Sequence, residues 1–294
     1  MTDTAALPGI LDAEGLAPKS VGLWQITSRR LIRRKSAIVG MIVLGILILV
    51  ALTAPLIAPY SPTKVLLGVE KVKQREAPCI HLLGCPADRP QHIAGIDGNV
   101  RDQFSRLLYG ARLSLMVGFS TVSFAIIIGT MLGALGGYFG SWVDNVIMRV
   151  MDVLLAFPSL LLAIAIVTVL GPGLINALLA IGIVSIPAYA RVVRASVLSV
   201  REMDYVSATR ALGASNMQIL FRRILPNALT PLIVQGTLGI ATAILDAAAL
   251  SFLGLGAQPP TPEWGAMLGA ERNQVFTAPH LVFLPGAAIA LTVL

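Results

Sequence analysis

The side chain with the strongest claim to a chemical role is a single carboxylate inside an otherwise apolar segment. Asp246 lies in the stretch AILDAAALSF. Because a carboxylate in hydrocarbon costs several kcal/mol, it is expected to face a bundle interior, a partner helix or water. A helix-to-helix hydrogen bond, or a position near the outer end of the segment, is the favoured interpretation, and contact with a substrate is the functional alternative. A proton relay is disfavoured because no histidine or second carboxylate accompanies it.

The sequence contains none of the common catalytic motifs. It has no G-x-x-x-x-G-K-[ST], so the chain cannot cradle ATP phosphates by itself, and it has no G-x-S-x-G and no H-E-x-x-H. The histidines are His81, His92 and His280, which the topology predicted below places outside or near the outer face. We therefore expect no catalytic residue, no metal site and no cofactor bound by this chain.

The composition requires lipid as the solvent for much of the chain. Of the 294 residues, 56% are hydrophobic and 13% are charged, more apolar side chain than one soluble core of this size can bury. A helix that crosses the membrane needs about 20 apolar residues. Six segments approach that length: 37–58, 113–135, 153–170, 174–190, 229–255 and 281–294. The last is short, and the sequence is expected to stop inside that helix. The predicted fold class is an all-α membrane protein with six transmembrane helices.

Glycines and prolines inside these segments predict how the helices pack. The second segment carries small residues at the spacing that lets two helix backbones approach closely, namely Gly129, Gly133, Gly136 and Gly137. Pro158 and Pro187 are candidate kink sites in the third and fourth segments.

The charge pattern predicts the orientation. The stretch RRLIRRKS at 29–36 holds five cations, which by the positive-inside rule places the tail 1–36 in the cytoplasm. The loops 59–105, 171–173 and 256–280 then lie outside, and 136–152 and 191–228 lie inside. The net charge of +7 is explained by this orientation and by anchoring to the membrane surface. No nucleic acid is expected, because the cations flank the spans without interleaved aromatic residues.

Both cysteines fall in the long outer loop, at Cys79 and Cys85. An oxidising compartment favours a small disulfide-closed loop. Free thiols and a metal site that uses His81 and His92 are the alternatives, and the spacing alone does not decide among the three.

The inner loop 199–228 has the signals of a short capped helix. Ser199 and Glu202 have the S-x-x-E form of a capping box, so a helix is expected to begin there. It can run to Leu212, where Gly213 supplies the left-handed residue that commonly closes a helix.

A second short helix follows in the same loop. Ser215 and Gln218 form another capping box, and Pro226 is expected to end this helix. The alternative is an ordinary basic loop that lies on anionic lipid. Because two capping boxes flank a turn at Gly213, which we call the elbow, a rigid element that docks on a protein is the favoured interpretation.

The stretch DYVSATRALGASNMQILFRRILPNALTPLIV resembles the EAA loop of ABC importer permeases. Ser207, Ala208 and Thr209 stand where Glu-Ala-Ala is usual, so the carboxylate typical of the first position is missing, and Glu202 and Asp204 are the nearby substitutes. The resemblance implies the following ATPase-coupling residues: Glu202, Asp204, Ser207, Ala208, Thr209, Arg210, Gly213, Leu225 and Pro226.

A second stretch narrows the resemblance. GIDGNVRDQFSRLLYGARLSLMVG, at 95–118, is similar to the signature of dipeptide, oligopeptide and nickel permeases of the second-subunit type. The stretches at 136–164 and 250–270 and the final FLPGAAIALTVL are similar to the same group.

The resemblance implies a type I, MetI-like importer permease in the bacterial cytoplasmic membrane, with a permease core at 106–294 and a cytoplasmic coupling helix. Its partners would be a second related permease, two ATPase subunits that hold ATP and Mg, and an extracytoplasmic binding protein that delivers peptides. Asp246 becomes a candidate for the translocation path. Glutathione-like solutes and nickel complexes are alternative cargoes. An ion- or proton-coupled carrier acting alone is the alternative class, but it calls for internal repeats and paired intramembrane charges, which the sequence lacks.

Overall fold

The computed structural model describes residues 35–293 of the chain. The tail 1–34, and with it most of the basic stretch at 29–36, lies outside the described residues. Two compact units are distinguished, Met1–Leu44 and Gly45–Leu294, and the first contributes only the beginning of helix α2 (Lys35–Ile57) to the description.

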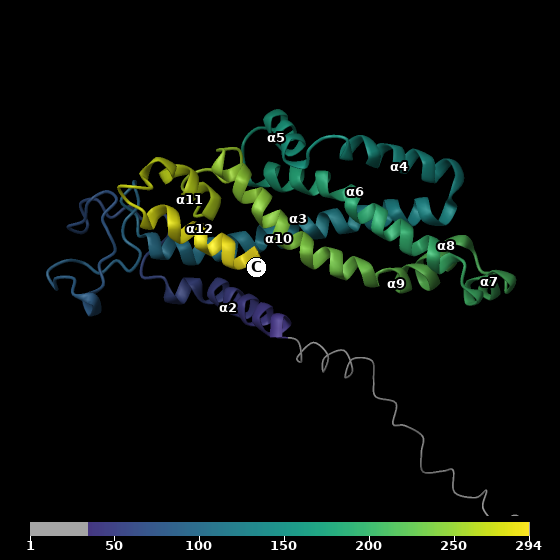
Figure 1. The fold of residues 1–294 in the computed structure, drawn as a ribbon, viewed down its shortest axis with the longest axis horizontal. Helices are drawn as coiled ribbons and strands as arrows, with labels where there is room; N and C mark the ends of the chain where they lie inside the picture. Colours follow the sequence, from purple (N-terminus) through teal and green to yellow (C-terminus); the bar gives the residue numbers. More distant parts are fainter. Residues whose placement is uncertain (1–34, 294) are drawn as a thin grey trace, which may run out of the picture. The chain divides into compact units, whose positions relative to one another are not determined.

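The second unit is helical (Figure 1). Residues 35–293 hold no strand beyond three isolated bridges, in agreement with the predicted all-α class. The longer helices are α3 (Gln103–Phe139), α4 (Ser141–Leu155), α5 (Ser159–Leu170), α6 (Leu174–Arg201), α10 (Thr230–Phe252) and α12 (His280–Val293). The shorter ones are η1 (His81–Leu83), α7 (Asp204–Ala211), α8 (Asn216–Ile219), the π-helical turn η2 (Leu220–Ile224), α9 (Leu225–Ala228), α11 (Trp264–Glu271) and η3 (Arg272–Gln274).

Four helices are long and apolar enough to cross a membrane, namely Ile38–Ile57 within α2, then α3, α6 and α10. They coincide with four of the six predicted segments. The predicted third span at 153–170 is not one continuous helix, because it is divided between the end of α4 and α5, which meet at an angle of 92°. Pro158 lies at the break, where its ring lacks an N–H and disfavours helical backbone for Phe157. The 12 residues of α5 reach only about 18 Å, so α4 and α5 make at most one bent span. The sixth segment forms α12, a helix of 14 residues.

Helix α3 is the longest of the described helices, and several other helices of the bundle pack against it. Its 37 residues extend about 55 Å, and it packs along α6 and α10. The glycines of α3 make this contact close, as predicted: Gly133 lies directly against the carbonyl oxygen of Ala190, and a Cβ added at Gly137 would lie 3.0 Å from the carbonyl oxygen of Arg194. Gly136 differs, because it faces Asp144 of α4. The buried core between these helices consists mainly of Ala, Val and Ile.

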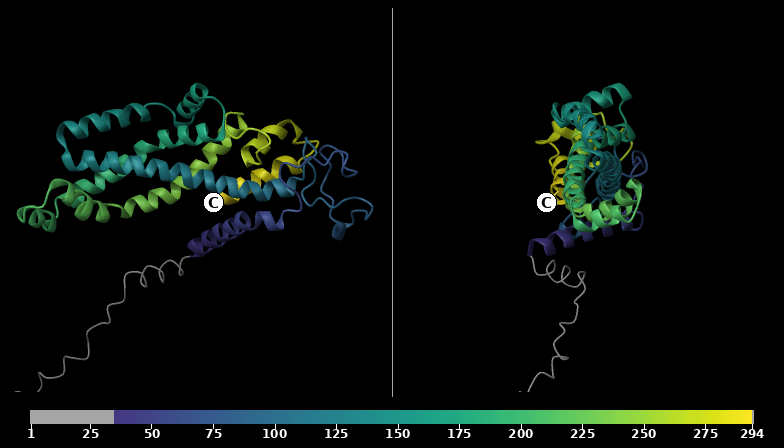
Figure 2. Two further views of the ribbon diagram at one scale, coloured as in Figure 1. Left: turned by 180° about the vertical axis from the view of Figure 1, so that it is seen from behind. Right: turned by 90° about the vertical axis from the view of Figure 1, so that its right-hand side faces the viewer.

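The two ends of the bundle carry different structures. Helices α7 and α8 lie at one end, whereas the irregular residues 58–102 lie at the other, beside α11 and the beginning of α12 (Figures 1 and 2). Residues 58–102 are held by a disulfide between Cys79 and Cys85 and by backbone pairing of Cys79 with His92.

Candidate functional site

The element between α6 and α10 starts later than the capping pattern predicts. Helix α6 runs through Ser199 to Arg201, so the prediction that Ser199 and Glu202 cap a new helix is wrong. Val193, Val197 and other apolar residues at the end of α6 remain buried in the core, and this burial outweighs a local capping pattern. Glu202 instead ends α6, and its carboxylate accepts a hydrogen bond from Nε of Arg201 at 3.1 Å.

The elbow has the geometry that its sequence predicts. Helix α7 ends at Ala211, and Gly213 has φ of +81°, in the left-handed region that glycine tolerates. The N–H of Gly213 donates to the carbonyl of Arg210 at 3.0 Å. Ser215 then caps α8, where its hydroxyl accepts from the N–H of Gln218 at 3.4 Å. The change of direction between α7 and α8 is therefore fixed by backbone geometry.

Pro226 does not end the second helix, contrary to the prediction. Helix α8 passes into the π-helical turn Leu220–Ile224 and then into α9, which ends at Ala228. In the π turn the N–H of Leu225 donates to the carbonyl of Leu220, five residues back. This wider turn leaves space for the ring of Pro226 and disrupts the regular backbone hydrogen bonds at the point where proline lacks an N–H. The helix can therefore continue past it.

Buried side chains join α7 and α8 to the bundle. Val206, the inward residue of α7, is 1% exposed, and Ile219 and Leu220 are fully buried. The hydroxyl of Tyr138, near the end of α3, donates to Oδ1 of Asn216 at 2.9 Å. These contacts connect α7 and α8 to the end of α3.

Arg201 adds a link between α6 and α3. Its Nη1 donates to the carbonyls of Gly137 and Tyr138 at 3.1 and 3.2 Å. The guanidinium thereby satisfies carbonyls in the last turn of α3, which have no partners within that helix.

The outward face of α7 carries most of the predicted coupling residues. Glu202, Asp204, Ser207, Ala208 and Arg210 are exposed, and Thr209 is half-buried. Among the residues the structure describes, none supplies an ion pair to the carboxylate of Asp204.

Apolar side chains accompany these polar groups on the same surface. Leu212 is 88% exposed beside the elbow, and Met203 and Met217 are 46% and 52% exposed. Gly213 is exposed at the elbow, whereas Leu225 and Pro226 lie in α9, at the root of the element. We call the surface formed by 202–217 the α7 surface.

Asp246 lies apart from the α7 surface. It is half-buried in α10, closer to Phe252 than to Thr230. Within 35–293 its carboxylate accepts no hydrogen bond and forms no ion pair, so the structure does not supply the helix-to-helix hydrogen bond within this chain. Its place in a translocation path stays a prediction.

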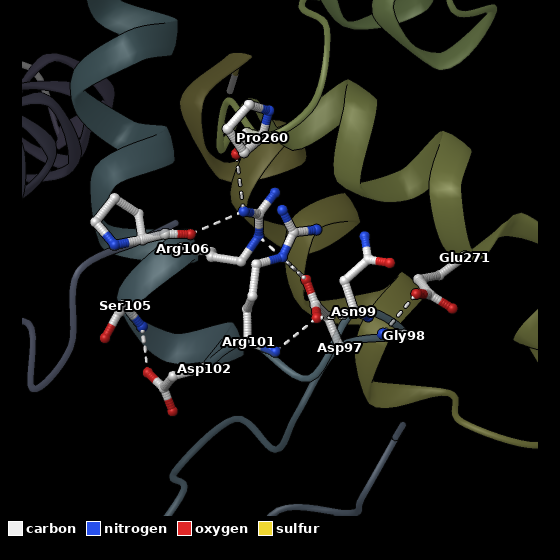
Figure 3. Close-up of polar contacts among 10 residues, drawn as sticks. Asp97, Gly98, Asn99, Arg101, Asp102, Ser105, Arg106, Pro260 and Glu271 are labelled. Atoms are coloured by element: carbon white, nitrogen blue, oxygen red, sulfur yellow. Dashed lines mark hydrogen bonds and ion pairs between the residues drawn. The ribbon is translucent and has the colours of Figure 1, made fainter. Parts of the chain in front are cut away.

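A buried polar cluster at the opposite end of the bundle was not singled out as a site from the sequence, although the stretch 95–118 supplies much of it (Figure 3). Asp97 accepts from the backbone N–H and from Nε of Arg101, both at 2.8 Å. Nη1 of Arg106 donates to the carbonyls of Pro62 and Pro260 at 2.9 and 3.0 Å. Arg106 thus ties the beginning of α3 to two loops that lie far apart in the sequence.

Two carboxylates extend this cluster. Asp102 caps α3, because its Oδ2 accepts from the N–H of Ser105 at 2.7 Å. Glu271 of α11 accepts from Nε of Arg75 at 2.9 Å and from the N–H of Gly98 at 2.8 Å. The signature stretch therefore fixes residues 58–102 to α3 and to α11.

His92 is enclosed by two acidic side chains. Its ring nitrogens lie 2.8 Å from Oδ1 of Asp102 and 3.2 Å from Oε2 of Glu70, and its ring is 5.4 Å from that of Tyr60. Burial opposes the charged imidazole, but the hydrogen bonds and charges of Asp102 and Glu70 outweigh burial and raise the pKa of His92 above 6.5. The protonated ring is therefore stabilised by the folded loop.

We expect the stability of this loop to depend on pH through His92. Because the folded-state pKa is raised, the contribution is fully present below the ordinary pKa of about 6.5 and is lost as the pH rises through the raised value. Thermal unfolding of the purified protein, compared at about pH 6 and pH 8, should show this loss. In His92→Gln the difference between the two pH values should shrink, and an unchanged difference would assign the pH dependence to other groups.

The described residues contain no cluster of three or more potential metal ligands among His, Cys, Asp and Glu. The alternative of a metal site with His81 and His92 has no geometric support. His81 contacts the carbonyl of Arg89 at 2.9 Å, whereas His92 is engaged by its two carboxylates. The two cysteines are joined to each other.

Comparison with known proteins gives consistent relatives for almost the whole chain. Residues 125–294 match the family described as "Binding-protein-dependent transport system inner membrane component", and residues 22–78 match the "N-terminal TM domain of oligopeptide transport permease C". The dipeptide transport system permease protein DppC of Alkalihalophilus pseudofirmus is 48% identical over 94% of this chain and 86% of its own length. The di/tripeptide transport system permease protein DppC of Pseudomonas aeruginosa is 47% identical over 88% of this chain and 83% of its own length.

A relative that is named for another cargo is also similar. The glutathione transport system permease protein GsiD of Pectobacterium atrosepticum is 41% identical over 99% of this chain and 90% of its own length. Among solved structures, the MetNI methionine ABC transporter in an inward-facing conformation has a chain with a TM-score of 0.51 and 21% identity, covering 64% of this chain and 90% of that one. That likeness concerns the fold alone.

Proposed function

The chain belongs to the family of binding-protein-dependent transport system inner membrane components, and we propose that it is the permease subunit of an ATP-driven importer for short peptides. The observation that carries the mechanism is the α7 surface, which is exposed on its outward face and bonded to α3 through Asn216. Energy would come from separate ATPase subunits that hold ATP and Mg, since this sequence lacks a phosphate-binding motif.

The proposed assembly places the α7 surface in the cytoplasm, where it enters a groove of an ATPase subunit. Nucleotide-driven closure of the ATPases would then bias the permease between two conformations. The exposed Leu212, Met203 and Met217 support a partner at this surface, because apolar side chains gain by being covered. Ser207 leaves the exposed Glu202 and Asp204 to supply the negative charge.

We further propose that α2, α3, the bent pair α4 and α5, α6, α10 and α12 make six membrane crossings in the bacterial inner membrane, with the N-terminus in the cytoplasm. A second related permease would complete the translocation pathway, and the outer ends of α10 and α11 would face an extracytoplasmic binding protein. The two cationic residues Arg191 and Arg194 near the inner end of α6 support this orientation.

Short peptides are the cargo that the relatives support best. The three relatives described above transport dipeptides, di- or tripeptides and glutathione according to their names, and glutathione is itself a tripeptide. The test is uptake into proteoliposomes that contain the complete transporter with its binding protein. Uptake of a labelled dipeptide should require internal ATP and should persist when ionophores collapse ion gradients. Uptake that stops with the gradients would favour the ion-coupled alternative, and a preference for nickel complexes would reassign the cargo.

We expect Gly213→Val to reduce coupling while the chain still inserts and folds. A valine at φ of +81° is strained by about 1–2 kcal/mol, although an added Cβ would meet nothing within 4 Å. The measurement is uptake per ATP hydrolysed in the same proteoliposomes. Gly254→Val is the matched control, since Gly254 has φ of +80° and equally open surroundings but lies after α10, away from the α7 surface. Equal coupling in both variants would count against the elbow.

A further inference from the structure

The polar cluster at the end opposite the α7 surface contains more buried positive charge than its acceptors balance. Arg101 and Arg106 are 7% and 4% exposed, and both approach one carboxylate, Asp97, which is 5% exposed. Their Nε atoms lie 2.8 and 3.4 Å from the same oxygen, Oδ2 of Asp97. The neighbouring Glu271 is engaged by Arg75 and by the N–H of Gly98, so it forms a separate pair. One carboxylate therefore serves two buried guanidinium groups (Figure 3).

Several donors of these two arginines have no acceptor in the part of the chain that the structure describes. Arg101 uses only Nε of its side chain, and Arg106 uses Nη1 for two carbonyls. Nε of Arg106 is buried without a hydrogen bond. The terminal nitrogens of Arg101 and Nη2 of Arg106 also lack an acceptor among the described residues, but they are not fully buried. Two guanidinium groups that share one carboxylate leave one positive charge without its own counter-ion, which an added anion would balance.

A cavity is lined by both arginines. Its volume is about 50 Å³, and its polar lining consists of Asp97, Asn99, Arg101, Gln103, Arg106, Thr261 and Glu271, of which Glu271 is already engaged by Arg75 and Gly98. A single water needs roughly 10–15 Å³ of such volume. The cavity can therefore admit one small polar group, but it is too small for a whole peptide.

We propose that this cavity is a binding site for a single carboxylate group, held by the guanidinium groups of Arg101 and Arg106. A guanidinium presents parallel N–H donors that match the two oxygens of a carboxylate. The choice of a carboxylate among anions rests on the proposed function, because every unblocked short peptide carries one; the preference for an anion rests on the cluster alone. The carboxylate can come from the C-terminus of the cargo or from an acidic side chain of the binding protein.

The anion preference is tested with the complete transporter in lipid nanodiscs, using acetate as the probe. Acetate should raise the unfolding temperature and bind with a measurable Kd, whereas acetamide, its neutral analogue, should do neither at equal ionic strength. An equal response to acetate and acetamide would overturn the site without touching the transport function. This comparison needs only the unaltered protein, so it stays decisive if a variant folds poorly.

Variants then test whether acetate binds at Arg101. Arg101→Lys keeps the charge but loses the paired donors, and we expect its Kd for acetate to rise at least tenfold while it still folds. Arg89→Gln is the matched control, because Arg89 belongs to the same loop and is 61% exposed. Its Kd for acetate should equal that of the unaltered protein. A normal Kd in Arg101→Lys would contradict the assignment.

Two competition experiments identify the source of the carboxylate. If a dipeptide competes with acetate and its C-terminal amide does not, the carboxylate belongs to the cargo. If the binding protein competes without any peptide, the carboxylate belongs to that partner. If acetate binds but neither competes, the cavity holds an adventitious ion only, and the proposed role is overturned while ATP-driven uptake stands.

Discussion

Leu212→Asp should abolish the co-purification of ATPase subunits with this chain while leaving the chain itself folded. Leu212 is 88% exposed beside the elbow, so a charged replacement costs the isolated chain little. In the assembled transporter the leucine would be covered, which contributes about 1.5–3 kcal/mol. Loss of that contribution weakens association roughly 10- to 150-fold, and burying the new carboxylate would weaken it further. The measurement is the amount of ATPase retained on the tagged permease in detergent, together with its unfolding temperature.

Leu83→Asp is the control for this experiment. Leu83 is 82% exposed in the disulfide-closed loop, at the other end of the bundle, so the same change of chemistry is made away from the α7 surface. It should leave ATPase retention at the level of the unaltered chain. Equal retention by Leu212→Asp and the unaltered chain would contradict the assignment of the α7 surface.

Gly133→Ala should have the largest effect on the fold of the permease itself. The glycine lies directly against the carbonyl oxygen of Ala190, so an added methyl group meets backbone that cannot rotate away. Helices α3 and α6 would have to separate along a contact that organises the bundle. Overpacking of this kind costs about 1–3 kcal/mol and occasionally more. We expect a lower unfolding temperature in nanodiscs and less assembled transporter in the membrane.

The matched control for Gly133→Ala is Gly45→Ala in α2. An alanine there meets nothing within 4 Å, and alanine favours a helix more than glycine does. The unfolding temperature of Gly45→Ala should stay the same or rise slightly. A similar fall in both variants would show that helix glycines matter here for reasons other than close packing.

Hydropathy predicted the long apolar helices because a membrane span is a local property of about 20 residues. The predicted segment 37–58 became α2, within two residues at either end. At 153–170 hydropathy marked one segment where the structure has two helices, because mean hydropathy does not register a bend. Pro158 was noted as a candidate kink, yet the chain turns there by 92°, enough to divide the segment between two helices.

The loop between α6 and α10 shows which local sequence signals correctly predict the ends of helices in the folded chain. Gly213 and Ser215 act through backbone and near neighbours, and both behave as their types predict. The pattern at Ser199 is equally good in sequence but lies on a helix whose apolar face is buried, so α6 continues through it. The effect of Pro226 depended on a π turn before it, for which the sequence offers no simple signal.

The polar cluster could not be assembled from sequence patterns. Its partners lie far apart along the chain: Arg106 and Pro260 are separated by 154 positions, and Arg75 and Glu271 by 196. The signature stretch at 95–118 marked the region as distinctive, but only the fold brings α3, α11 and residues 58–102 together. The unmatched guanidinium donors become visible at that stage.

The central claim, that the α7 surface is the contact with the ATPase, is tested most directly by photocrosslinking from position 207 in the assembled transporter. A photoreactive amino acid replaces the exposed Ser207, and the crosslinked partner is identified by mass spectrometry. Our account predicts crosslinks to the ATPase subunit, and none to that subunit from the same probe at Leu83. Crosslinks from 207 to the extracytoplasmic binding protein, or to the ATPase only from position 83, would contradict both the proposed orientation and the proposed mechanism.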